Sequence, residues 1–383
     1  MNIREVEVLK KLLEYWNETP KHSDGSILGS MTTIPHPLAQ YAYNLFIHTN
    51  YADTRIFPVL KEFEEQVFNG LREIYGFFET GLVTSGGSES NFLAILAAYR
   101  LRNTSEKIVV APDTVHVSVV KSCDILSIKL VKIPVNSEPV DPLLVEDYVR
   151  KYKPFLIIVT AGTTERGVVD PVKEVGEIAS MYNVFLHVDA AYGGLIVPFL
   201  YKRGLLKKNL GFFDGVSSIT VDFHKNGLTP IPSSLLLFRN SKFREAVTFP
   251  NNYSLSGYTF GILGTRPGGS VASIWTMWML YGSDGFEKQA LEMYENAIYL
   301  YEELSKLKDI IVYKPELPIV VFKHKYIHYK SLLSKLLEKG FYLYTSPSLE
   351  ALRIVVMPHI KREHLNRFIM VLREVIEKIN EYE

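Results

Sequence analysis

The sequence has 383 residues, of which 47% are hydrophobic and 22% are charged, a composition that excludes a disordered chain. This length exceeds what one hydrophobic core usually organises, so we expect one large domain and one smaller domain. The formal net charge is zero, which argues against nucleic acid or an anionic membrane as a partner.

The first part of the chain predicts helices joined by an extended arm. Residues 1–16 have the spacing of an amphipathic helix, and their scattered charges lack the apolar core of a signal peptide. Residues 19–37 are rich in Gly, Ser and Pro and predict an extended stretch. A polar helix is expected from Arg55 to Tyr75. We therefore assign residues 1–54 to an N-terminal helix and arm.

Strand and helix patterns then alternate along the chain. Short apolar runs predict buried strands at 81–85, 107–112, 127–135, 155–162, 184–190, 216–222 and 233–238. Helical periodicity fills most of the intervals, at 89–101, 115–126, 143–152 and 172–182. Strands that are apolar on both faces indicate a mostly parallel sheet covered by helices, and the short last connection predicts an antiparallel final pair. This α/β pattern defines a large domain at 55–290.

The only cysteine, Cys123, lies in one of these predicted helices. A single thiol excludes an internal disulfide and a cysteine-based metal cluster, and it fits a reducing cytoplasm. We expect no metal site.

The pattern changes toward the C-terminus. Residues 271–281 form the most apolar stretch, which is shorter than the roughly 20 residues that a membrane helix needs and predicts a buried helix. A long helix begins near Phe286, and shorter strands with a charged terminal helix follow it. We therefore expect a small α+β domain at 291–383, packed closely on the large one, in a soluble cytoplasmic protein.

Polar clusters follow four predicted strands, where open α/β sheets bind their ligands. The segment from Thr84 to Asn91, TSGGSESN, places paired glycines at a helix start, which offers N–H groups to a phosphate. A serine-capped helix entry explains that segment equally well when it stands alone. His116 follows another strand and could stack on an aromatic ring, although a partly buried histidine without that role is the commoner case.

The other two clusters contain Asp189 and Lys225, at the ends of successive strands. A buried carboxylate needs a cation, and a protonated pyridine nitrogen would serve; capping of the next helix is the alternative for Asp189. Apolar surroundings favour a nucleophilic amine for Lys225, and a surface position is its alternative. The ordered set of phosphate loop, histidine, Asp and Lys favours a site for pyridoxal 5′-phosphate (PLP).

These residues resemble the fold-type I PLP enzymes, in particular the group II amino-acid decarboxylases of the archaeal tyrosine/aspartate type, with sphingosine-phosphate lyase as a near relative. The segments that carry the resemblance are GSMTTIPHP, HTNYADTRIF, TSGGSESN, HVDAAYGG, VDFHKNG, GTRPGG and LRIVVMPH. They span almost the whole chain, and VDAAYGG followed by DxHK is a specific signature of this branch. The resemblance implies a fold-type I transferase fold with a mostly parallel seven-stranded sheet, a small C-terminal domain and a homodimer.

The resemblance also implies roles for individual residues. Lys225 would carry PLP as a Schiff base, Asp189 would pair with the ring nitrogen, and Gly87 and Ser88 would bind the phosphate. Further cofactor contacts would come from His116 and Ala191 on the two ring faces, Thr163 at the rim, Thr220 and His224 near the phosphate, and Gly264 and Thr265 across the dimer interface.

A tyrosine of the loop 251–260 would donate a proton in catalysis, with Tyr253 as first choice and Tyr258 as second, and His116 is the alternative residue for delivering this proton. Arg353 is the candidate for a substrate carboxylate, with a structural ion pair as its alternative, and Asn50 and Tyr258 complete the substrate contacts. The chain departs from the family where Phe223 replaces a common Pro and Ser88 a common Thr.

The predicted reaction is decarboxylation of an L-amino acid, with tyrosine, aspartate or glutamate as substrate. A carbon–carbon lyase of the sphingosine-phosphate type is the alternative, and a second phosphate site beside the first would favour it. A non-catalytic PLP-binding protein and a transaminase are more remote, because the lysine is retained and the signature is that of the decarboxylase branch.

Overall fold

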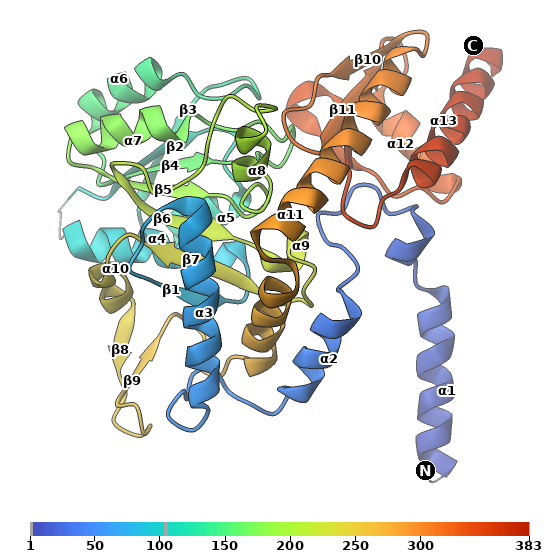
Figure 1. Ribbon diagram of the computed structural model, residues 1–383. Coiled ribbons are helices and arrows are strands. Elements are labelled where there is room, and N and C mark those ends of the chain that lie inside the picture. The colour runs from blue at the N-terminus through green and yellow to red at the C-terminus, as the bar shows by residue number, and fades with distance from the viewer. Residues whose placement is uncertain (1–2, 103–105, 383) are drawn as a thin grey trace.

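The computed structural model describes residues 3–102 and 106–382 and shows a large domain built on a seven-stranded sheet (Figure 1). The strands are β1 (Thr80–Thr84), β2 (Ile108–Pro112), β3 (Lys129–Ile133), β4 (Leu156–Thr160), β5 (Phe185–Asp189), β6 (Val216–Val221) and β7 (Ser234–Phe238). Their order is β1-β7-β6-β5-β4-β2-β3, and β7 runs in the opposite direction to the other six strands. The predicted mostly parallel sheet and antiparallel final pair are confirmed.

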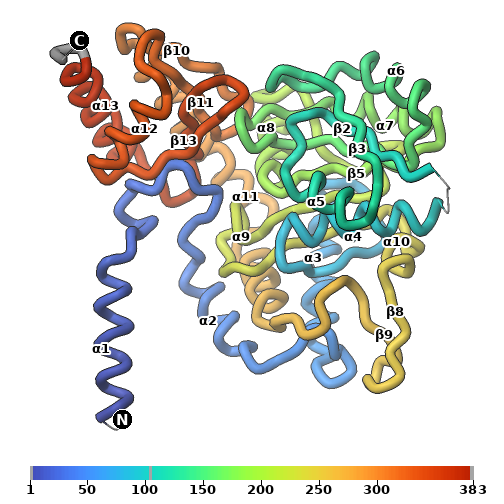
Figure 2. The backbone as a smooth tube through the Cα atoms, turned by 180° about the vertical axis from the view of Figure 1, so that it is seen from behind, coloured from blue at the N-terminus to red at the C-terminus, as the bar shows by residue number. Residues whose placement is uncertain are grey.

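Helices cover this sheet because its central strands are apolar on both faces, and β1, β4, β6 and β7 are buried along their whole length (Figures 1 and 2). The helices of the large domain are α3 (Pro58–Tyr75), α4 (Gly87–Arg102), α5 (Val117–Ile125), α6 (Pro142–Tyr152), α7 (Val172–Met181), α8 (Val197–Lys202), α9 (Phe223–Asn226) and α10 (Ser241–Ala246). Helix α4 contacts α5 and α10, α6 contacts α7, and both α3 and α8 contact α11 (Gly268–Ser305).

Helix α11 leads from the large domain to the small one. It contains both the apolar stretch and the long helix expected in this region, merged across a kink at Gly282, whose φ of 55° and ψ of −165° are not helical. The small domain holds the antiparallel strands β10 (Ile310–Tyr313), β11 (Ile319–His324), β12 (Tyr344–Ser346) and β13 (Ala351–Val355), with α12 (Tyr329–Glu338), the 3₁₀ turn η2 (Pro347–Leu349) and α13 (Arg362–Tyr382).

The N-terminal arm joins this small domain before it enters the large one. After α1 (Ile3–Glu18) and the 3₁₀ turn η1 (His22–Asp24), Ile27 forms a parallel bridge with Tyr342. Helix α2 (Pro37–Leu45) then packs on α11. The arm thereby runs along the junction between the two sheets, where Met31 reaches the site described below.

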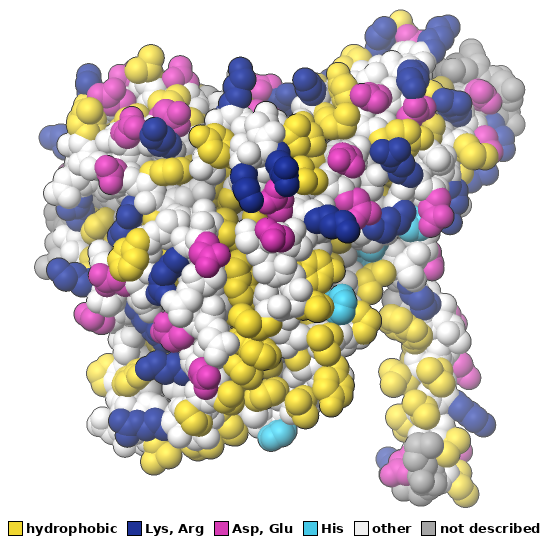
Figure 3. Space-filling model, in the orientation of Figure 1, with side chains coloured by type: hydrophobic (Ala, Val, Ile, Leu, Met, Phe, Trp, Pro, Cys, Tyr) yellow, Lys and Arg dark blue, Asp and Glu magenta, His cyan; other side chains and the backbone are white. Residues whose placement is uncertain are grey.

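Two elements project from the body. Helix α1 stands apart in both views and buries none of its side chains (Figures 1 and 2). The hairpin of β8 (Thr248–Pro250) and β9 (Tyr258–Phe260) points away from the large domain. Hydrophobic side chains gather along α1 and over the ends of α2 and α11 that face it (Figure 3). Within the described ranges, the longest apolar helical windows fall short of what a bilayer crossing requires.

Candidate active site

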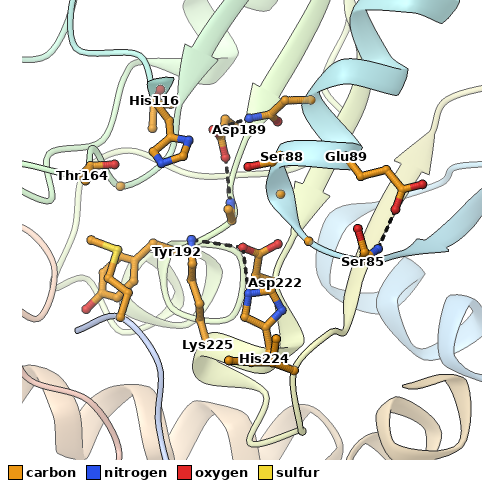
Figure 4. A pocket seen from close by; sticks show the side chains of 18 residues that line it. Ser85, Ser88, Glu89, His116, Thr164, Asp189, Tyr192, Asp222, His224 and Lys225 are labelled. Carbon is orange, nitrogen blue, oxygen red and sulfur yellow. Dashed lines mark hydrogen bonds and ion pairs between the residues drawn. The ribbon is translucent and has the colours of Figure 1, made fainter. Parts of the chain in front are cut away.

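A cavity of about 350 Å³ lies at the carboxyl ends of the central strands (Figure 4). Loops that follow β1, β2, β4, β5 and β6 contribute its walls, so that segments distant in sequence meet at one edge of the sheet. Seven residues named from the sequence line it, namely Gly87, Ser88, His116, Asp189, Ala191, His224 and Lys225. The four strand-end clusters therefore form a single site.

The glycine loop forms one wall, where α4 begins at Gly87 with its N-terminal N–H groups lacking partners within the helix. A Cβ at Gly87 would lie 3.1 Å from the Cβ of Ala191 and 3.2 Å from both carboxylate oxygens of Asp222, so a side chain would crowd this wall. The capping alternative is also partly realised, since Glu89 accepts a 2.7 Å hydrogen bond from the Ser85 N–H. A helix entry of this kind suits an anion.

Asp189 ends β5 and is buried at the floor of the cavity. One carboxylate oxygen accepts a 3.1 Å hydrogen bond from the Ala191 N–H, and the other accepts a 2.8 Å bond from the side-chain amide of Asn91. The backbone bond that was its alternative is thus present. A carboxylate offers about four acceptor positions, so Asp189 keeps capacity for a further donor such as a protonated ring nitrogen.

Lys225 lies in the short helix α9, with its Nζ atom 3.1 Å from Oδ2 of Asp222. Asp222 is almost fully buried and also accepts a 2.6 Å hydrogen bond from the Ser234 hydroxyl, while Nε2 of His224 lies 3.6 Å from it. The lysine therefore faces the cavity as one half of an ion pair. Asp222 was not singled out from the sequence, although its spacing of three residues before Lys225 within VDFHK was a usable signal.

The two cavity histidines are held by bonds at Nδ1. Nδ1 of His116 accepts a 3.2 Å bond from the Ser118 N–H as the cap of α5 and lies 2.9 Å from the Ser118 hydroxyl. Nδ1 of His224 lies 2.8 Å from the Ser233 carbonyl oxygen. Burial lowers the pKa of both imidazoles, and the charge of Asp189 opposes this shift at His116.

Three residues expected at the site point elsewhere. The Thr163 hydroxyl accepts a 3.2 Å bond from the Val168 N–H and does not line the cavity, where the neighbouring Thr164 takes its place. Thr220 lies beneath the floor and bonds to Asn91 at 3.2 Å. The side-chain oxygen of Asn50 accepts bonds from two backbone N–H groups, those of residues 52 and 266, each at 3.0 Å, and Asn50 is likewise not part of the lining.

Arg353 is buried behind the lining and makes no ion pair among the described residues. Its guanidinium donates to the carbonyl oxygen of Thr164 and, at 3.1 Å, to that of Gly29. Burial lowers the pKa of Arg353. The structural ion pair that was the alternative for Arg353 is not found among the described residues; Arg353 instead ties the loop at Thr164 to the arm at Gly29.

The site residues expected from the loop 251–260 and from the turn at Gly264 and Thr265 lie away from the cavity. Tyr253, at the tip of the hairpin, is 93% exposed, and Tyr258 on β9 is about half exposed. Neither they nor Gly264 and Thr265 line the cavity of their own chain.

The lining residues fit PLP by their chemistry. They supply a helix N-terminus for a phosphate, a carboxylate for a ring nitrogen, an imidazole and a methyl group for the ring, and an amine for the aldehyde. Two buried atoms of the lining, Oγ1 of Thr160 and Oε1 of Glu89, lack hydrogen-bond partners within the described parts of the chain. A polar ligand is the expected partner for such atoms.

Known proteins resemble this chain along nearly its whole length. Residues 30–325 match the family model described as the pyridoxal-dependent decarboxylase conserved domain. The probable L-tyrosine/L-aspartate decarboxylase of Methanosphaera stadtmanae is 36% identical over 379 residues, with 97% of each chain covered. The L-aspartate decarboxylase of Thermococcus kodakarensis is 34% identical over 382 residues, with 98% of each covered. Among solved structures, the glutamate decarboxylase of Lactobacillus brevis matches with a TM-score of 0.85 at 22% identity, covering 98% of this chain and 92% of that one, and the predicted fold class is confirmed.

Proposed function

The chain belongs to the pyridoxal-dependent decarboxylase family, and from that premise we propose that it removes CO₂ from L-tyrosine, L-aspartate or L-glutamate with PLP held by Lys225. Its enzyme class and cofactor, as predicted from the sequence, are confirmed by that membership. The choice of substrate and the roles of individual residues are the proposal.

One observation carries these roles. Lys225 and Asp189 come from adjacent strand ends and line the same cavity, with the glycine loop of α4 as a third wall. Helix caps and surface lysines do not require these three features to meet. Gly87 and Ser88 would hold the phosphate, Asp189 the ring nitrogen, and His116 and Ala191 the two faces of the ring.

PLP, when bound, supplies an aldehyde that condenses with amines and a ring that takes up the electron pair released at Cα. The first step for the chain's own residues is a proton transfer. Lys225 must lose a proton to act as an amine, and Oδ2 of Asp222, 3.1 Å from the Nζ atom of Lys225, is the neighbouring acceptor. Asp189 keeps the ring nitrogen protonated by accepting its hydrogen bond, and His116 gives the ring an uncharged face.

Arg353 remains our candidate for binding a substrate carboxylate. Its two N–H bonds at present go to neutral carbonyl oxygens, of Thr164 and Gly29, and a carboxylate is the stronger acceptor. Thr164 lines the cavity, so the loop that Arg353 holds borders the proposed substrate position. The relatives' printed substrates, tyrosine with aspartate in one and aspartate in the other, support an acidic or phenolic side chain.

The active form would be a homodimer in which each chain completes the other's site. Tyr253, Tyr258, Gly264 and Thr265 would act at the partner's cavity, with Tyr253 as the proton donor. Exposed apolar side chains on α1, α2 and the part of α11 before its kink support such an interface, among them Trp16, Tyr41 and Leu280. Residence in a reducing cytoplasm is part of the proposal, since the one cysteine is buried and unpaired.

The deciding experiment measures amine and CO₂ release from a panel of L-amino acids by the PLP-loaded enzyme. We expect release from tyrosine, aspartate or glutamate. No release from any amino acid, together with cleavage of a phosphorylated amino alcohol, would transfer the assignment to the lyase alternative.

The role of Lys225 is tested by reduction. Borohydride should fix the cofactor covalently to Lys225 in the wild-type protein, as a mass increase on the peptide that contains it. Lys225→Ala should lose this labelling and the visible absorption band while still binding PLP through the phosphate loop. Labelling of a different lysine would refute the assignment.

A further inference from the structure

A buried network connects two residues of the proposed site from below. Its centre is Asn91, a buried residue on the inner face of α4. The side-chain amide of Asn91 forms hydrogen bonds through both its nitrogen and its oxygen. The amide nitrogen lies 2.8 Å from Oδ2 of Asp189 and 2.9 Å from the Ser118 hydroxyl. The amide oxygen lies 2.9 Å from Nε2 of His187 and 3.2 Å from the Thr220 hydroxyl.

The direction of these bonds follows from Asp189. An ionised carboxylate can only accept, so the NH₂ end of Asn91 must face it and the oxygen must face His187 and Thr220. His187 therefore carries its proton on Nε2. Burial lowers the pKa of His187 to about 4, so the ring is neutral near pH 7 and its Nδ1 accepts from the Ser218 hydroxyl at 2.8 Å.

The second branch reaches His116. The second N–H of Asn91 occupies a lone pair of the Ser118 hydroxyl, so this hydroxyl directs its own proton to Nδ1 of His116, 2.9 Å away. Nδ1 also accepts the Ser118 backbone N–H at 3.2 Å. With both donors aimed at Nδ1, the neutral ring must carry its proton on Nε2. An imidazolium would place its Nδ1–H against the backbone N–H of Ser118, and the Ser118 hydroxyl would have to accept a hydrogen bond from Nδ1 instead of donating one.

The charges around His116 do not overturn this state. Asp189 and Asp222 favour a protonated ring, while Lys225 and Lys121 oppose it, and these four come from the ends of β5 and β6, from α9 and from α5. Burial is the largest influence and lowers the pKa of His116. The hydrogen-bond geometry and the electrostatics therefore agree on a neutral ring.

We propose that Asn91 is a positioning residue that uses one amide group to orient Asp189 as an acceptor and, through Ser118, to hold His116 as the neutral tautomer with its proton on Nε2. The inference rests on the proposed PLP site for its functional meaning. In that site His116 is an uncharged ring surface and a hydrogen-bond donor at Nε2. It is not a base, because its other nitrogen is permanently occupied.

The first test needs no cofactor. In apoprotein labelled with ¹⁵N and ¹³C at histidine, the resonances of His116, assigned by their loss in His116→Gln, should show the Nε2–H tautomer across neutral pH. Ser118→Ala should lower the share of the Nε2–H tautomer without abolishing it, because it removes the hydroxyl donor to Nδ1 and leaves the backbone N–H of residue 118 in place. A wild-type His116 that carries a proton on Nδ1 near pH 7 would overturn the proposal.

The second test separates the two branches in PLP-loaded protein. Asn91→Asp keeps the acceptor toward His187 and Thr220 but sets a second carboxyl group against Asp189, and it should shift the pH titration of the cofactor's visible band by about one unit or more. Ser118→Ala leaves the Asp189 branch intact and should leave that titration in place. Equal titrations in the wild type and in Asn91→Asp would contradict a positioning role.

Loss of folding is controlled separately. Thermal melting of each variant shows whether it is folded, and if Asn91→Asp fails to fold, the wild-type tautomer and Ser118→Ala still decide the His116 branch. If the protein takes up no PLP, the proposed function fails while the apoprotein spectra still test the network.

Discussion

At the scale of single residues, Asp170 is the most heavily buried carboxyl outside the cavity among the residues whose side chains the structure describes. It is fully buried, and its oxygens accept backbone hydrogen bonds from Thr160 at 2.8 Å and Val140 at 3.0 Å. Burial raises the pKa of Asp170 from 3.8 to about 6, against the effect of these two bonds. A carboxyl whose pKa is higher in the folded than in the unfolded state binds its proton more tightly when folded. It therefore costs stability as the pH rises through this interval.

We predict that Asp170→Asn flattens this pH dependence. Between about pH 4 and pH 6, the wild type should lose roughly 2 to 3 kcal/mol of its stability relative to the variant, the value of a shift of about two pKa units. His187 and His359 titrate in both proteins and cancel in the difference. Urea unfolding at a series of pH values measures the difference in unfolding free energy between the wild type and Asp170→Asn. A wild-type-minus-variant difference that stays constant across this interval would contradict the prediction.

Single residues also mark the limit of what the sequence could predict. Asp189 and Lys225 were accessible because each follows an apolar strand within a recognisable motif. The residues that orient the site could not be predicted, because they bond to residues that are distant in the sequence. Asn91 bonds to His187 across 96 residues, and Arg353 bonds to Thr164 across 189 residues. Motif spacing carries no information about such contacts.

At the scale of elements, strands were predictable and exposed elements were not. All seven strands of the large sheet lie within a residue or two of the predicted apolar runs, because burial on both faces leaves a continuous hydrophobic signal. The β8–β9 hairpin gave no such signal, since most of its residues are partly exposed. The turn after β6 was expected as a tight connection, and the structure adds α9 within it, which aims Lys225 into the cavity.

The start of α4 gives the element-scale prediction. Gly87→Ala would place a Cβ 3.1 Å from Ala191 and 3.2 Å from the Asp222 carboxylate, which narrows the phosphate cradle without a forbidden backbone angle. We expect PLP affinity to fall by about tenfold or more, with a melting temperature close to that of the wild type. Absorbance titration of apoprotein with PLP measures the affinity. Ser88→Ala is the matched control, because it removes a hydroxyl without adding bulk and should weaken binding less.

At the scale of the whole molecule, two projecting elements bear on the proposed homodimer. Helix α1 exposes Leu12, Leu13 and Trp16 and contacts no core, although a lone sixteen-residue helix is marginally stable in water. The β8–β9 hairpin projects from the large domain (Figure 1), and Tyr253, Gly264 and Thr265 do not line the chain's own cavity. Both features are accounted for if a second copy covers the apolar helix and receives the hairpin.

Hybrid dimers test this arrangement directly. One chain would carry Lys225→Ala and the other Tyr253→Phe, with different affinity tags so that only the hybrid is purified. If each cavity combines Lys225 of one chain with Tyr253 of the other, the hybrid has one intact site and one doubly altered site. It should then show about half of the wild-type decarboxylase activity per dimer, although each parent homodimer is at least about a hundredfold impaired. If Tyr253 serves its own chain, both sites of the hybrid carry a defect and the activity stays at the level of the parents. That result would overturn the shared site, because both cavities of the hybrid carry a substitution only when each cavity takes Lys225 and Tyr253 from the same chain.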